Sequence, residues 1–120
     1  MSFQVALTGL DAATANLEVI SNNIANSNTN GFKRSRAEFA DVYASSDFGA
    51  SSNATGDGVR VTNIRQQHTQ GDINFTDNNL DVAISGGGLF RLQDNGAGVV
   101  YSRAGAFGLD REGFISNASE

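Results

Sequence analysis

The first 28 residues constrain the fold of this chain most, because they combine helical periodicity with almost no charge. Apolar side chains recur there at steps of three and four, close to the ~3.5-residue period of a coiled coil. They are Phe3, Leu7, Leu10, Ala13, Leu17, Ile20 and Ile24. Between Ser2 and Asn28 the only charged residues are Asp11 and Glu18. A helix in water normally carries Lys and Glu on its outer face, so this segment is predicted to be a long helix that packs against other protein.

A second apolar set lies on an adjoining face of the predicted helix. Val5, Ala12 and Val19 are seven residues apart. The two sets together cover more than half of the circumference, whereas one core needs a stripe of ~100° or a little more. We therefore favour a helix buried in two interfaces over a helix on one ordinary core. The candidate subunit-interface residues are Phe3, Val5, Leu7, Gly9, Leu10, Ala13, Leu17, Val19, Ile20 and Ile24.

Gly9 and the asparagine-rich end of this segment carry separate signals. Gly9 costs about 1 kcal/mol relative to Ala inside a helix, which close approach of a neighbouring backbone would explain. The helix is expected to stop in the stretch from Asn26 to Asn30, with Gly31 as the left-handed cap.

The rest of the chain is predicted to be a connector followed by a β module. Residues 31–70 form the connector, with a mobile loop at 45–58 that is small, polar and rich in glycine, and then strand-like alternation at Val59 and Val61. From residue 71 short apolar runs alternate with turn signals such as SGGG, DNG and DREG. The candidate strands are Ile73–Phe75, Leu80–Ile84, Leu89–Leu92, Val99–Arg103, Ala106–Leu109 and Gly113–Ser116.

The predicted fold is therefore α+β: a helix over 1–30, an extended connector over 31–70, and the start of a small, mainly antiparallel β domain over 71–120. The last candidate strand ends close to Glu120, so we expect the β module to be incomplete and the chain to be part of a longer protein.

Composition excludes several function classes. The net charge of −5 argues against nucleic acid as the main partner, and the absence of cysteine argues against disulfides and thiolate metal sites. No apolar run is long enough to span a membrane, and no signal peptide is evident. The single histidine, His68, lacks a second metal ligand, and Gly86–Gly88 does not fit a phosphate loop. We expect no catalytic, metal or cofactor site. Lys33, Arg34 and Arg36 form a small basic cluster, either solvated or in contact with acidic neighbouring subunits.

The order and spacing of several motifs resemble bacterial flagellar axial proteins, the rod and hook family. These motifs are TGL at 8–10, NNIAN at 22–26 and GFK at 31–33. The later stretch LDVAISGGGLFRLQDNGAGVVYSRAGAFGLDREGFI resembles the first β domain of flagellar hook proteins, and the tract YSRAGAF at 101–107 favours hook over distal rod.

The resemblance implies a subunit that polymerises with itself into a helical tube, the flexible joint that transmits torque from rod to filament. It further implies export without a cleaved signal through the type III apparatus, a location in the extracellular flagellum, and contact with rod, hook–filament junction and hook cap proteins. The first helix would lie in the inner tube beside a C-terminal helix of the same chain. Phe39 and Tyr43 fit an aromatic export motif of the form Phe-x-x-x-hydrophobic; packing within the connector is an equally good interpretation.

Two other functions remain open at this point. A flagellar rod subunit belongs to the same structural class as a hook subunit. A secreted β-rich binding or adhesin module belongs to a different class and would be a monomer with an exposed binding surface. An enzyme is the least favoured, because no constellation of residues supports one.

Overall fold

The structure, a computed structural model, describes residues 2–43, 56–96 and 98–117 of the chain. Its first element is the helix α1, Ser2–Ala25, which confirms the predicted helix. No acidic residue lies in its first turn and no basic residue in its last, so charge does not compensate the helix dipole. The stability of α1 must therefore come mainly from what packs against it.

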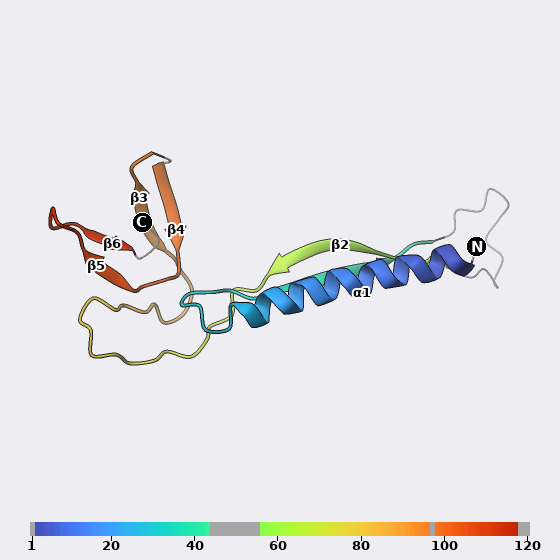
Figure 1. Cartoon of the computed structure of the whole chain (residues 1–120), viewed down its shortest axis with the longest axis horizontal. Coiled ribbons are helices and arrows are strands. Elements are labelled where there is room, and N and C mark those ends of the chain that lie inside the picture. Colours follow the sequence, from blue (N-terminus) through green and yellow to red (C-terminus); the bar gives the residue numbers. More distant parts are fainter. Residues whose placement is uncertain (1, 44–55, 97, 118–120) are drawn as a thin grey trace. The chain divides into compact units, whose positions relative to one another are not determined.

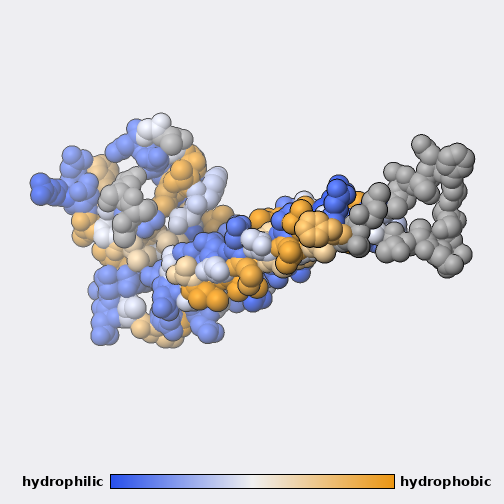
Figure 2. Space-filling model, turned by 45° about the vertical axis from the view of Figure 1, so that its right-hand side comes forward, coloured by the Kyte–Doolittle hydropathy of each residue, from blue (hydrophilic) through white to orange (hydrophobic). Residues whose placement is uncertain are grey.

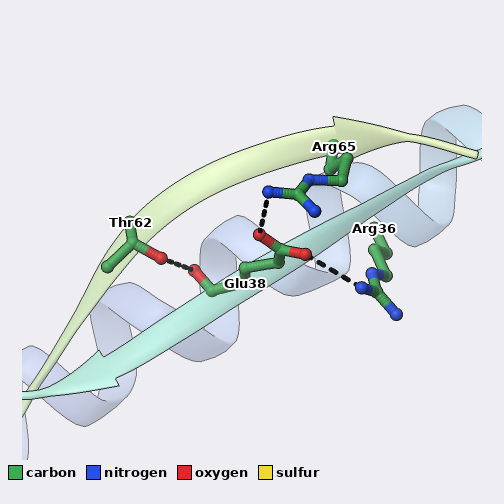
Figure 3. A network of polar contacts seen from close by, with 4 residues as sticks. All are labelled: Arg36, Glu38, Thr62 and Arg65. Atoms are coloured by element: carbon green, nitrogen blue, oxygen red, sulfur yellow. Dashed lines mark hydrogen bonds and ion pairs between the residues drawn. The ribbon is translucent and has the colours of Figure 1, made fainter.

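An antiparallel hairpin lies along α1 (Figure 1). Its strands are β1, Ser35–Asp41, and β2, Val59–Gln66, and the pairing continues beyond them through a hydrogen bond from the Gln67 amide to the Arg34 carbonyl. The ladder shifts register between Glu38 and Phe39, where Thr62 is the extra residue of β2. The Thr62 hydroxyl donates to the Glu38 carbonyl at 3.0 Å, which stabilises this bulge (Figure 3).

Two further hairpins form the β module (Figure 1). One pairs β3, Phe90–Asp94, with β4, Gly98–Ser102, and the other pairs β5, Phe107–Leu109, with β6, Ile115–Asn117. The rings of Phe90 and Phe107 meet edge to face at 5.2 Å, which joins the two hairpins through a half-buried contact.

The Arg103 side chain links the end of β4 to the glycine-rich turn predicted at residue 85. Its guanidinium group donates to the carbonyls of Ile84, Gly86 and Gly88. It also donates to the Gln70 amide oxygen at 2.7 Å, and that oxygen accepts a second bond from the Gly86 amide. The SGGG turn is thus held by one cationic side chain, and it serves as a structural turn.

Four predicted strands are confirmed as β3 to β6, and two are wrong. Residues 73–75 form no strand, and residues 80–84 make only an isolated bridge between Asp81 and Ala106. The reason is local: the Asn78 side chain accepts from the Leu80 amide, and Asp81 accepts from Thr76 and Asn78. Such side-chain bonds favour a turn over a ladder.

The chain divides into two compact units. Unit 1 contains residues 1–25 and 34–67, that is, α1 with the β1–β2 hairpin; unit 2 contains residues 26–33 and 68–120. The division predicted from the sequence, with boundaries at 30 and 70, remains a prediction. Most of the loop expected at 45–58 lies outside the described residues.

Candidate functional site: the two faces of the helix

Two polar side chains fix α1 to its hairpin. The Thr8 hydroxyl donates to the Val5 carbonyl and accepts from the Val59 amide at 3.3 Å. The Asn23 side chain donates to the Ser35 carbonyl at 2.7 Å and accepts from the Ser35 amide at 3.0 Å. These contacts lie fifteen residues apart along the helix, or about 22 Å at 1.5 Å per residue. They set the register of the hairpin on α1, and neither residue was among the sites predicted from the sequence.

The helix face beneath the hairpin is the covered one. Ala12 and Val19 are 7% and 8% exposed, and they are the two buried hydrophobic residues of the described chain. Val5, Thr8, Ala15 and Asn23 lie on the same side and are half-buried. The predicted second apolar set, built on Val5, Ala12 and Val19, therefore contacts a hairpin of the same chain. Thr8 and Asn23 share its direction at ~100° per residue, and that shared direction was the sequence signal that could have identified them.

The opposite face of α1 carries the larger apolar set, and it is bare. Phe3 is 79% exposed, Leu10 65%, Leu17 62% and Ile24 68%, with Leu7 and Ile20 at 48% and 42%. Ala13 is also exposed. Figure 2 shows apolar surface over the helical part of the molecule. Burying one such Leu, Ile or Phe side chain is worth ~1.5–3 kcal/mol. A contiguous row of this kind marks an interaction surface, and we call these seven residues the bare face.

The glycine predicted at an interface and the residues predicted to end the helix have different surroundings. A Cβ on Gly9 would meet nothing within 4 Å, so no packing within the described chain explains this glycine. Gly31 has a φ of +74°, as a left-handed residue should, and a Cβ there would overlap the backbone of Arg103 and Ala104. Helix α1 ends at Ala25, and turns fill residues 26–30, with the Thr29 amide donating to the Asn26 carbonyl. Asn30 is exposed in this turn region. Because α1 ends at Ala25, Gly31 lies six residues beyond the end of the helix.

The two candidate export residues lie on and beside the hairpin. Phe39 is in β1, opposite Val61 and next to the bulge, and is 42% exposed. Tyr43 follows β1 and is 84% exposed. An exposed aromatic pair at this spacing is accessible to a partner, and little packing within the described residues accounts for Tyr43.

The described residues give little support for a metal site, a membrane span or a ligand-binding site. They contain no group of three potential metal ligands and no helix long and apolar enough to cross a membrane. An open hollow of about 470 Å³ in unit 2 is lined in part by Lys33, His68, Tyr101 and Arg103. Arg103 is fully engaged with carbonyls, and Lys33 donates to the Thr69 carbonyl at 2.7 Å.

Comparison with known proteins identifies similar chains. Residues 3–33 match the family model described as "Flagella basal body rod protein". The chain is 49% identical over 117 residues to the flagellar hook protein FlgE of Salmonella typhimurium and 48% identical to that of Escherichia coli; both alignments cover 98% of this chain and 27% of the relative. It is 44% identical over 121 residues to the flagellar basal-body rod protein FlgG of Agrobacterium fabrum, covering 91% of this chain and 46% of the relative. The chain thus spans about a quarter of the length of the hook proteins that it matches.

Proposed function

This chain belongs to the family of flagellar rod and hook proteins, and from that premise we propose that it is a structural subunit of the bacterial flagellar hook. In this role it polymerises with itself into a helical tube that transmits torque from rod to filament. It needs no cofactor and performs no chemical reaction. The greater identity to hook proteins, 49% against 44% for a rod protein, supports hook over rod.

The bare face of α1 is the observation that carries this proposal. A helix with one face under its own hairpin and large apolar side chains on the other needs a second layer of protein to exclude water. In a tube built from such subunits, the bare faces pack against helices of the same and neighbouring chains. The β1–β2 hairpin of the same chain covers one face of α1, and the proposed assembly would supply the second of the two interfaces expected from the sequence.

Electron microscopy of the purified subunit under polymerising conditions tests this proposal. We expect tubes from the unaltered subunit and none from Leu10→Glu, because the new carboxylate would be buried without a partner. Gln4→Glu is the matched control, because it adds the same charge on the polar strip of α1, the side of the helix that carries Asp11 and Glu18. A subunit that stays monomeric under all conditions, or a Leu10→Glu variant that forms normal tubes, would refute the proposal.

A rod subunit is the second candidate, supported by the rod relatives at 42% and 44% identity. Complementation separates the two. The hook assignment predicts that the gene restores hooks and swimming to a bacterium that lacks its hook protein, and fails in one that lacks its distal rod protein. The opposite pattern would favour the rod.

We further propose that Phe39 and Tyr43 are recognised by the export apparatus that delivers the subunit to the outside of the cell. Their exposure on and beside the hairpin supports this role. Under this proposal the pair matters before assembly, when the subunit is still in transit, rather than in the finished tube.

A further inference from the structure

The outer surface of the β1–β2 hairpin, on the side away from α1, carries an unusual concentration of positive charge. Arg36 and Glu38 of β1 lie on this side with their cross-strand neighbours in β2. The bulge at Thr62 brings Arg60 and Arg65, which are five residues apart, to this same side, whereas Val59 and Val61 lie on the other. We call these four residues the arginine face. It holds three of the eight basic residues of a chain with a net charge of −5.

Internal ion pairs neutralise this face only in part (Figure 3). Arg36 and Arg65 are direct cross-strand partners, and Glu38 contacts Arg36 at 2.9 Å and Arg65 at 3.5 Å. Both arginine side chains remain about 60% exposed, at 57% and 61%. Exposed pairs of this kind contribute ~0–1 kcal/mol, and like charges placed opposite each other are unfavourable. The stability of the hairpin therefore does not explain why two arginines share one glutamate.

Arg60 is a further arginine on this face whose presence the stability of the hairpin does not explain. Its cross-strand partner is Ala40, and the described residues give its exposed side chain no hydrogen bond or ion pair. The arginine face thus has excess positive charge at both ends of the hairpin, since Arg36 and Arg65 share one carboxylate and Arg60 has none among the described residues. Such an excess is expected of a surface that meets an acidic partner.

The same chain contains a segment of matching chemistry. No Lys or Arg occurs between Arg65 and Arg91, whereas three aspartates, Asp72, Asp77 and Asp81, do. Asp81 is engaged by Thr76 and Asn78. Asp72 and Asp77 are exposed and have no such partner among the described residues. Residues 67–80 run without a helix or strand (Figure 1), so these two carboxylates are presented on a loop.

We propose that the arginine face of one subunit binds the Asp72–Asp77 loop of a second copy of this chain in the polymer. This contact rests on the proposed function and adds to it a polar, salt-dependent interface besides the apolar contact of the helices. Charge complementarity argues for this partner, because one chain carries both an acidic loop and a basic sheet face, and a repeating array of copies offers each basic face the acidic loop of another subunit.

Charge reversal in the full-length subunit tests this contact. The hairpin variant carries Arg60→Glu and Arg65→Glu, and the loop variant carries Asp72→Arg and Asp77→Arg. Each alone should raise the critical concentration for polymerisation roughly tenfold, and an equal mixture of the two should restore it, because each basic surface then finds an acidic one. The control, Arg91→Glu with Arg111→Glu, changes the net charge as much as the hairpin variant and should have little effect.

Several outcomes would overturn the inference. These are normal polymerisation of the hairpin variant, an equal defect in the control, or rescue only when all four substitutions are in one chain, which would place the contact within a subunit. The single change Arg60→Glu removes no hydrogen bond or ion pair that the described residues make, so it serves as the test if the double variant misfolds. It should also weaken assembly. If the unaltered subunit forms no polymer, the proposed function fails, and this inference fails with it.

Discussion

Single residues in this chain have two kinds of task, and their surroundings separate them. Arg103 donates to three carbonyls and one side-chain amide of its own unit, so its role is internal. Among the described residues Gly9 contacts nothing that explains a glycine, so we expect its role to lie outside the single subunit. Both lie in motifs that indicate the family in the sequence, yet only the structure shows which of them the single subunit needs.

Arg103→Lys should lower the free energy of unfolding of the subunit by ~1–2 kcal/mol. An ammonium group lacks the planar fork that reaches several carbonyls at once. Chemical denaturation measures this change. Arg91→Lys is the control, because Arg91 is exposed in β3. Equal stability of the two variants would show that the guanidinium network contributes nothing.

Gly9→Ala should have opposite effects on the free subunit and on the polymer. In the free subunit the extra methyl group would meet none of the described residues, so the gain in helix propensity should stabilise α1 by up to about 1 kcal/mol. In the polymer the same methyl group should obstruct a close backbone neighbour and raise the critical concentration. A variant that assembles as readily as the unaltered protein would remove the packing explanation for Gly9.

At the scale of elements, the sequence predicted α1 well because periodicity is a local property. It did not predict β1, whose residues Ser35–Asp41 are mostly small or polar and gain strand character only by pairing with residues of β2 that lie 18 to 31 positions further along the chain. It overpredicted strands at 73–75 and 80–84, because apolar alternation alone does not supply a hydrogen-bonding partner. The bare face was visible in the sequence, whereas the partner of the covered face was not.

The two faces of α1 should respond differently to substitution. Val19→Asp places a charge beneath the hairpin, where the residue is 8% exposed, and should destabilise the free subunit by several kcal/mol. Leu17→Ala should leave the free subunit nearly unchanged, since Leu17 is 62% exposed, but should cost ~2–5 kcal/mol where the polymer buries it fully. Thermal unfolding and polymerisation assays report the two effects separately. Equal loss of monomer stability in both variants would contradict the division into a covered and a bare face.

At the scale of the whole molecule, the proposed function requires that the subunit be exported before it assembles. Replacing Phe39 and Tyr43 together by Ala should leave the cellular level of the subunit intact and reduce the amount secreted, because both exposed rings are available to a partner. Immunoblots of cell and culture fractions measure this. Arg34→Ala with Arg36→Ala, in the same segment, is the control. Normal secretion by the aromatic double variant would leave these residues with packing roles only.

The described residues bury few side chains, and the two that are buried most, Ala12 and Val19, lie between α1 and its own hairpin. Apolar residues of the β module such as Phe75, Leu109 and Phe114 are more than 65% exposed. This pattern is typical of a subunit whose stability is completed by its assembly. The central claim is therefore that the bare face of α1 becomes buried when subunits polymerise.

Thiol labelling of Leu17→Cys tests that claim most directly, because the chain contains no other cysteine. The variant is carried as a minority subunit in a polymer of unaltered protein, so that assembly itself is not impaired. The thiol should react at least roughly tenfold more slowly in the polymer than in the free subunit, whereas Glu18→Cys on the polar strip should change much less. A Leu17→Cys thiol that reacts equally fast in both states would contradict the account.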